Sequence, residues 1–378
     1  MKSFFRPFVI CLIDLFLFFF KRNKKIVLCT GWNGLRFADN SRYIFLYLNT
    51  YRENICLDQI VWLSNDSQIC RELNEAGYTA YMKCSFMSIY YHLRAGYIFY
   101  DQFNNDLFVV LTRKSRMVNL WHGMPIKKFG VWSGLDWNLK SDYLFTCSDF
   151  GDKLIGKAFY TEPNHYIHGM YPRNYYLTEP ISYLTKDERF SLDLIQKKKR
   201  ENKKILFYLP TFRKSQLQFL GITDLEKINL FFDFLDDHGY FLMTKIHTGG
   251  YYSNNDTIAD SIKERILNLP PQTDIYPFLK ETDILITDYS SVLFDFLYLN
   301  RDIICYAYDL YMYEHEDKGF LIDYQSLPAD RVYSLDELKE NLQKKVYKRD
   351  DHANDRKRWL KKCFDNRTMN DTIQALLR

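Results

Sequence analysis

Polar residues able to do chemistry follow five apolar runs that the sequence predicts to be strands. They are His122 with Gly123 and Pro125, Thr211 with Arg213, Lys245 with His247, Asp288 with Ser290 and Ser291, and Asp309. Ligands of parallel α/β sheets bind where the carboxyl ends of the strands meet. We therefore expect these side chains to gather at a functional site, although one polar strand end alone would mean little.

Two histidines in this set suit proton transfer. Imidazole titrates near neutral pH, so His122 can take a proton from a substrate hydroxyl. His247, close to Lys245, can donate a proton or a hydrogen bond to a phosphate. The alternative for each is a structural role, which is commoner for a single histidine.

The run Asp288-Tyr-Ser-Ser predicts an anion site. A strand ends at Asp288 and a helix begins at Ser290 and Ser291, where free backbone N–H groups and the helix dipole favour a phosphate or diphosphate. The alternative is that Ser290 only caps the helix. Arg173 and Arg213 can each grip two phosphate oxygens, and their alternative is a surface ion pair.

We expect no metal and no cofactor. The sequence lacks a GxxxxGK[ST] motif, a DxD pair at the end of an expected strand, and Cys or Cys/His groups at zinc spacing. The eight cysteines favour buried, reduced thiols of a cytosolic protein. A mechanism that relies on cationic side chains and helix dipoles fits these observations.

The elements that position these residues alternate between strand and helix twice, over residues 24–148 and 203–308. This alternation predicts the α/β class, with two doubly wound Rossmann-type domains facing a central cleft. Residues 161–202, with three prolines and the run QKKKRENKK, are expected to connect them. The expected parts are a hydrophobic helix at 1–23, domains at 24–180 and 181–348, and a basic helix at 349–378.

Length and charge agree with this division. The 378 residues are too many for one ordinary core. The net charge of +4 hides basic ends, because residues 1–25 carry +5 and residues 339–378 carry +6, which leaves −7 for the body. An acidic body argues against nucleic acid as a partner, and basic ends favour an anionic membrane surface.

The segment FFRPFVICLIDLFLFFF at 4–20 is followed by four basic residues. It has no small-residue cleavage site, and Arg6 and Asp14 interrupt a run already short for a bilayer. Three interpretations stay open: an aromatic helix lying in the membrane interface, a first helix packed on the domain, or a true span.

Five segments resemble the CDP-glycerol glycerophosphotransferase family of teichoic-acid and capsule synthesis. They are WHGMPIKKFG at 121–130, GMYPRN at 169–174, YLPTFR at 208–213, KIH at 245–247, and the longest stretch, 274–319. The resemblance implies a GT-B fold and a transfer of polyol phosphate from a CDP-polyol donor to a hydroxyl group, with release of CMP. It also implies a lipid-linked glycan or polyol-phosphate acceptor at the cytoplasmic face of the cell membrane.

The resemblance also implies roles for residues. His122 falls on the proposed base and His247 on a role at the diphosphate. Contacts to the phosphates of the donor fall on Ser290 and Ser291. Other donor contacts fall on residues of the five motifs or close to them: Gly123, Pro125, Arg173, Thr211, Arg213, Lys245, Asp288 and Asp309. Met124 stands where the family usually has threonine, which puts in doubt a polar contact there and the usual donor.

Several alternatives remain at this point. The polyol can be glycerol or ribitol, and one unit or many can be added. A GT-B glycosyltransferase using a nucleotide sugar is the alternative enzyme. An inactive, membrane-bound assembly partner is the alternative that is not an enzyme.

Overall fold

The computed structural model describes residues 17, 19–103, 106–134, 141–211, 219–222, 224–245, 262, 264–317, 319–347 and 351–378. Of the expected hydrophobic helix at 1–23, only residues 17 and 19–23 fall among these, so that helix is not confirmed. Within the described part of the chain, no helix is both long enough and apolar enough to cross a membrane.

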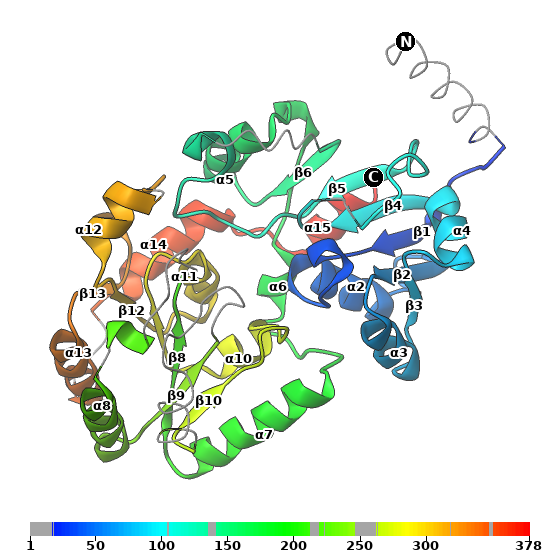
Figure 1. Cartoon of the computed structure of the whole chain (residues 1–378). Coiled ribbons are helices and arrows are strands. Elements are labelled where there is room, and N and C mark those ends of the chain that lie inside the picture. Colours follow the sequence, from blue (N-terminus) through cyan, green and yellow to red (C-terminus); the bar gives the residue numbers. More distant parts are fainter. Residues whose placement is uncertain are drawn as a thin grey trace, which may run out of the picture. The chain divides into compact units, whose positions relative to one another are not determined.

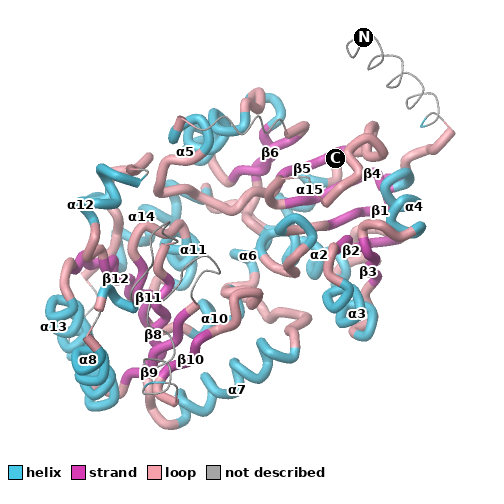
Figure 2. The backbone as a smooth tube through the Cα atoms, in the orientation of Figure 1, coloured by secondary structure: helices cyan, strands magenta, loops and turns pink. Residues whose placement is uncertain are grey.

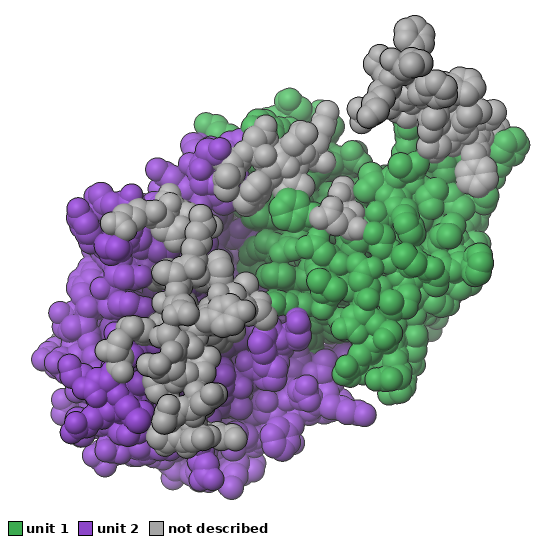
Figure 3. Space-filling view, in the orientation of Figure 1, with its two compact units in different colours: residues 1–122, 136–176, 366–378 green, residues 123–135, 177–365 purple. Residues whose placement is uncertain are grey.

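The chain forms two compact units (Figure 3). Unit 1 contains residues 1–122, 136–176 and 366–378, and unit 2 contains residues 123–135 and 177–365. The chain therefore passes from unit 1 into unit 2 directly after His122, returns to unit 1 for residues 136–176, and returns to it again for its last residues.

Unit 1 is built on a parallel sheet of seven strands in the order β3-β2-β1-β4-β5-β6-β7 (Figure 1). Its first six positions have the strand order of a Rossmann fold. The strands are β1 (Asn23–Cys29), β2 (Gln59–Ser64), β3 (Thr79–Met82), β4 (Ala95–Tyr100), β5 (Arg116–Asn119), β6 (Tyr143–Thr146) and β7 (Tyr166–His168). The central strands are apolar throughout because both faces of the sheet are covered, and all six residues of β4 are buried.

The helices of unit 1 follow the strands in sequence. They are α2 (Asp39–Thr50), α3 (Ser67–Glu75), α4 (Phe86–Arg94), α5 (Asp149–Ile155), α6 (Pro172–Tyr175) and α15 (Met369–Leu376), with shorter helices η1 (Trp32–Gly34), η3 (Gly156–Phe159) and η4 (Pro163–His165). Local chemistry starts several of them, since Asp66, Ser85 and Ser148 accept backbone N–H groups at the beginnings of α3, α4 and α5. Figure 2 shows these helices packed along the strands.

Unit 2 has a parallel sheet of six strands in the order β10-β9-β8-β11-β12-β13. Counted within the unit this is again the Rossmann order. The strands are β8 (Lys204–Leu209), β9 (Tyr240–Thr244), β10 (Ile266–Asn268), β11 (Ile284–Thr287), β12 (Asp302–Tyr306) and β13 (Asp330–Val332). The α/β class with two parallel sheets is thus confirmed.

Helices of unit 2 cover its sheet, and one of them lies in a segment that the sequence predicted to be a linker. They are α7 (Lys186–Arg200), α8 (Leu225–Asp237), α10 (Tyr276–Glu281), α11 (Val292–Phe296), α12 (Leu310–Met312), α13 (Leu335–Tyr347) and α14 (Ala353–Phe364), with shorter helices η2 (Gly130–Ser133), η5 (Phe219–Gly221), η6 (Leu297–Leu299), η7 (Tyr313–Asp317) and η8 (Tyr324–Ser326). The expected connection at 161–202 contains a boundary between the units, after Tyr176, but it is not a plain linker, because it also contains β7, α6 and α7. A reciprocal capping box between Thr185 and Glu188 starts α7 despite its low hydrophobicity.

The expected basic helix at 349–378 is two helices. Asp365 and Asn366 have φ of 49° and 48°, which ends α14, and a capping box between Thr368 and Asp371 starts α15. Helix α15 belongs to unit 1, where the Tyr97 hydroxyl donates to the Leu377 carbonyl at 2.6 Å.

The sequence pattern of residues 256–266 predicts a helix, most of which lies outside the described residues. Residue 262 is helical, and the strand β10 begins at Ile266. Cys56 and Cys84 are exposed, although the five other described cysteines are buried as expected.

Candidate active site

His122 lies in a constrained turn directly after β5. Trp121 has a φ of 51°, and its backbone N–H donates to Asn119 Oδ1 at 3.0 Å. The Asn40 side chain donates to the Trp121 carbonyl at 2.8 Å. These contacts from both sides fix the backbone that carries His122.

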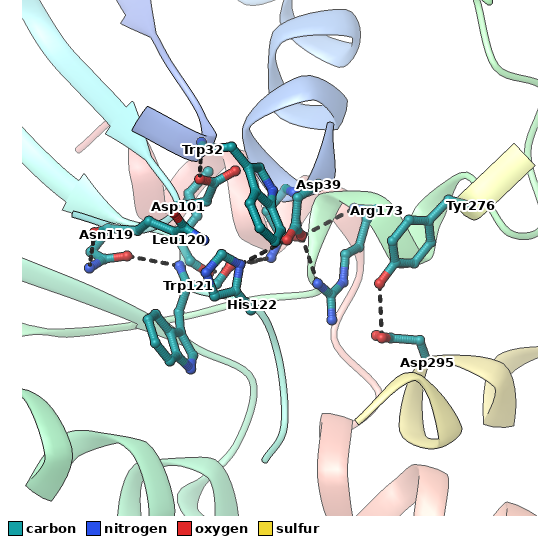
Figure 4. A network of polar contacts seen from close by, with 12 residues as sticks. Trp32, Asp39, Asp101, Asn119, Leu120, Trp121, His122, Arg173, Tyr276 and Asp295 are labelled. Atoms are coloured by element: carbon teal, nitrogen blue, oxygen red, sulfur yellow. Dashed lines mark hydrogen bonds and ion pairs between the residues drawn. The ribbon is translucent and has the colours of Figure 1, made fainter. Parts of the chain in front are cut away.

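Asp39, at the start of α2, orients the imidazole (Figure 4). Its Oδ2 lies 2.8 Å from His122 Nδ1, and its Oδ1 lies 2.6 Å from an Arg173 nitrogen. Burial alone would raise the pKa of Asp39, but the Arg173 charge and the His122 hydrogen bond outweigh burial and hold that pKa well below its ordinary value. Asp39 is therefore an ionised acceptor, so His122 donates from Nδ1, and in the neutral imidazole the lone pair is then on Nε2.

Arg173, which was expected as a phosphate clamp, is buried beside Asp39 with 4% of its side chain exposed. Its alternative, a surface ion pair, does not describe this contact, because both partners are largely removed from solvent. The backbone N–H of Arg173 also lies 3.4 Å from Asn40 Oδ1. The structure thus brings His122 and Arg173 together through Asp39, a residue that the sequence patterns did not single out.

Two tryptophans flank His122. The ring centres of Trp32 and Trp121 lie 5.2 Å and 4.7 Å from that of the imidazole. The Trp32 backbone, with a φ of 49°, donates to Asp101 Oδ1 at 3.0 Å. Burial, together with the nearby Asp39 charge, raises the pKa of Asp101 well above its ordinary value. A carboxyl group that favours its neutral form therefore anchors the loop that places Trp32.

A second group of predicted residues gathers in unit 2 at the carboxyl ends of β8, β11 and β12. Asp288 is buried, and its Oδ1 accepts the backbone N–H of Thr211 at 2.8 Å. The Tyr289 hydroxyl donates to Asp309 Oδ1 at 2.9 Å, and Tyr324 donates to the Asp288 carbonyl at 3.1 Å. Asp288 therefore organises the backbone here, and Tyr289 orients Asp309.

Three other predicted residues lie at the same edge of this sheet. Lys245 follows β9, and its Nζ donates to the Thr273 carbonyl at 2.5 Å. Ser290 and Ser291 precede α11, and the only side-chain cap there is a long contact of 3.5 Å from Val292 N to Ser290 Oγ. Capping therefore leaves the Ser290 hydroxyl largely uncommitted, although a helix of five residues has a small dipole.

Gly123 and Pro125 begin the short segment of unit 2 that follows His122. Gly123 has a φ of 96°, which favours glycine over any residue with a side chain. The segment is held by backbone hydrogen bonds, from Leu321 N to the Ile126 carbonyl at 2.8 Å and from Lys128 N to the Gly319 carbonyl at 3.1 Å. Lys128, Leu310 and residues 319–325 line a hollow of about 380 Å³ beside Asp309.

Arg213 and His247 lie outside the described residues, so their predicted roles stay predictions. The residues that the sequence patterns missed are Asp39, Trp32 and Tyr289. For Asp39 a signal existed, since an acidic residue lies at the start of the helix α2 that follows the central strand β1.

If the chain holds a metal, the candidate group in the described part is Asp149, Asp152 and His168, whose ligand atoms lie within 4.8 Å of one another. His168 Nε2 lies 2.9 Å and 3.0 Å from the Asp152 oxygens. Thr146 also donates to Asp152. Ordinary hydrogen bonding accounts for this geometry, and the expected absence of a metal stays a prediction.

Comparisons with known proteins agree on one family. Residues 12–370 match the sequence model of CDP-Glycerol:Poly(glycerophosphate) glycerophosphotransferase. A teichoic acid poly(glycerol phosphate) polymerase of Bacillus spizizenii is 25% identical over 359 residues, which cover 88% of this chain and 86% of that protein. A teichoic acid glycerol-phosphate transferase of Staphylococcus aureus is 26% identical over 351 residues, which cover 84% of each chain.

A similar fold is found among solved structures. A variant of the wall teichoic acid polymerase TagF, soaked with CDPG, aligns with a TM-score of 0.69 and 20% identity over 97% of this chain and 90% of that one. At this identity the likeness shows the fold alone.

Proposed function

Because the chain belongs to the CDP-glycerol:poly(glycerophosphate) glycerophosphotransferase family, we propose that it transfers glycerol phosphate from CDP-glycerol to a hydroxyl group of a teichoic-acid or capsular-polysaccharide acceptor. The resemblance expected from the sequence motifs is confirmed by the match over residues 12–370. The observation that carries the proposal is the His122 imidazole, oriented by the ionised Asp39 so that Nε2 is free to accept a proton.

The reaction follows from that geometry. The acceptor hydroxyl gives its proton to His122 Nε2 as its oxygen attacks the phosphorus that bears glycerol. A new oxygen–phosphorus bond forms, and the bond from that phosphorus to the bridging oxygen breaks. The bridging oxygen leaves as part of CMP, and the positive charge that develops on His122 is stabilised by Asp39 at 2.8 Å.

The donor is assigned to unit 2. Thr211, Ser290 and Asp309 lie at the carboxyl ends of adjacent strands, the usual place for nucleotides in parallel sheets. Arg213 and His247 would add positive charge and a hydrogen-bond donor for the diphosphate. The mechanism needs no metal or cofactor, and that expectation stays a prediction.

The acceptor is assigned to a lipid-linked glycan or polyol phosphate at the cytoplasmic face of the cell membrane. Basic residues at both ends of the chain support an anionic surface as a partner. CDP-ribitol is the second donor to test, because relatives named as ribitol-phosphate polymerases also match this chain.

The test is a product analysis with the purified full chain. CDP-glycerol and a lipid-linked acceptor should yield CMP and an acceptor heavier by one or more glycerol phosphate units. Transfer of a sugar from a nucleotide sugar, with no gain of phosphorus, would favour a glycosyltransferase. A His122→Ala variant that keeps full activity would reject the assigned base.

A further inference from the structure

Helix α4 of unit 1 exposes large apolar side chains to solvent. Phe86 is 92% exposed, and Met87, Ile89 and Tyr90 are each at least 39% exposed. The opposite face of the helix is packed, since Ser88, Tyr91 and His92 are buried. The exposed face is thus a built feature of a fixed helix, not a frayed end.

A second exposed apolar pair lies in residues 107–113, which pack against α4. Val109 and Val110 are 42% and 50% exposed. The Phe108 backbone N–H donates to His92 Nε2 at 3.1 Å, and the Lys83 ammonium lies 5.2 Å from the Phe108 ring centre. We call Phe86, Met87, Ile89, Tyr90, Val109 and Val110 the apolar patch.

The two segments that carry the apolar patch contain basic but no acidic residues. Residues 76–100 and 107–118 contain no Asp or Glu but carry Lys83, Arg94, Arg113, Lys114 and Arg116. Contiguous apolar surface on a soluble domain usually marks an interaction site. An apolar surface on segments that carry only basic charges complements an anionic lipid surface, where aromatic side chains enter the interface and cations meet the headgroups.

The apolar patch is also tied to the chain that follows the hydrophobic segment 4–20. The Arg22 guanidinium donates to the Leu111 carbonyl at 2.6 Å and to the Arg113 carbonyl at 2.5 Å, and it also donates to the His92 carbonyl at the end of α4. Figure 1 shows α4 next to the start of β1. The basic run at residues 21–25 is therefore held at the same corner of unit 1 as the apolar patch.

We propose that the apolar patch and the basic residues of its two segments bind an anionic membrane surface directly, as a contact separate from residues 1–20. The inference rests on the proposed function in one respect, which is that the acceptor of the reaction is lipid-linked and therefore lies at a membrane. Binding to vesicles needs no turnover, so the two proposals can fail independently.

The test is flotation of the full chain with vesicles of phosphatidylglycerol and phosphatidylcholine, compared with phosphatidylcholine alone. Phe86→Glu combined with Tyr90→Glu should lower partition onto the anionic vesicles about tenfold. The matched control is Phe190→Glu with Tyr347→Glu, two side chains 76% and 85% exposed in unit 2, which should change partition less than twofold. Both double variants should keep CMP release with a water-soluble acceptor analogue.

Deletion of residues 2–18 separates the two contacts. The truncated chain should still bind anionic vesicles, and the Phe86→Glu and Tyr90→Glu pair should abolish that binding. Three results would overturn the inference: unchanged partition of the patch variant, loss of all binding on truncation alone, or tighter binding after truncation, which would mean that residues 2–18 normally cover the apolar patch. A fall from dimer to monomer in the patch variant, measured by light scattering without lipid, would instead assign the surface to a second copy of the chain.

Discussion

Asp39→Asn tests the orientation of His122, because an amide has one oxygen where the carboxylate uses two. In the native site Oδ2 accepts from His122 and Oδ1 accepts from Arg173. The buried Arg173 charge will take the single oxygen, which turns the amide NH₂ toward His122 Nδ1. The imidazole must then accept at Nδ1 and carry its proton on Nε2, where it cannot act as a base.

The magnitude follows from the two contacts. Loss of the correct imidazole tautomer should lower kcat/KM about 10³- to 10⁴-fold, since general-base catalysis and stabilisation of the imidazolium are both lost. This is about 4–5.5 kcal/mol of transition-state stabilisation. The free energy of unfolding of the variant should also be about 3–5 kcal/mol lower, because Arg173 loses its buried counter-ion.

The assay is release of CMP from CDP-glycerol with an acceptor, at a temperature where circular dichroism shows the variant folded. Asp106→Asn is the matched control, since Asp106 is a buried carboxyl of the same unit that accepts from Thr30 at 2.5 Å and does not contact His122. It should keep activity within about threefold.

A further variant tests whether Arg173 sets the orientation of the amide. Asp39→Asn with Arg173→Met should regain stability and part of kcat/KM, because no guanidinium then competes for the single amide oxygen, which can accept from His122 Nδ1. If Asp39→Asn kept more than a tenth of native kcat/KM, or if Asp106→Asn lost as much, the assignment of Asp39 as the residue that positions the base would be refuted.

Three other predictions follow from single contacts. Burial lowers the pKa of His92 from 6.5 to about 4, so between these pH values the unfolded chain binds a proton that the folded chain does not. The free energy of unfolding should therefore fall by up to about 3 kcal/mol as the pH drops from 6.5 to 4. Urea unfolding of His92→Gln should show a smaller fall over the same pH range. Gly169→Ala would place a Cβ 2.5 Å from Thr372 Oγ1 and should destabilise by about 1–3 kcal/mol, partly restored by Thr372→Ala in thermal melts. Tyr289→Phe removes the hydroxyl that donates to Asp309 Oδ1 and should raise the KM for CDP-glycerol about 3- to 10-fold with kcat nearly unchanged. An unchanged KM would remove Asp309 from the donor site.

The arrangement of strands was largely predictable from the sequence. Long apolar runs between helical segments are strong local signals, and the parallel order follows from their alternation. The short strands β7 and β13 were missed because three residues cannot show a period. Helix α7 could have been found, since Thr185 and Glu188 form a readable capping box, but its low hydrophobicity suggested a linker.

The residues of the candidate site likewise include some that the sequence predicts and some that it does not. Residues placed by strand ends, such as His122 and Asp288, follow from local pattern alone. Asp39 lies 83 residues before His122 in the chain, and nothing in the local sequence pairs them. A contact of this kind depends on the tertiary fold and on an unusual backbone angle, so periodicity and motif spacing do not contain it.

The unusual backbone angles around His122 are themselves informative. Trp32, Asp39 and Trp121 have φ of 49°, 62° and 51°, a region that side chains with a Cβ rarely adopt. Each costs about 1–2 kcal/mol, so together they cost roughly 3–6 kcal/mol, a large share of the 5–15 kcal/mol that typically stabilises a domain. Backbone hydrogen bonds donated to Asp101 and Asn119 hold Trp32 and Trp121 in place. Other residues of the described chain also have positive φ, but these three all contact or adjoin one imidazole. Their strain is best explained by its effect, which is a histidine oriented before substrate binds.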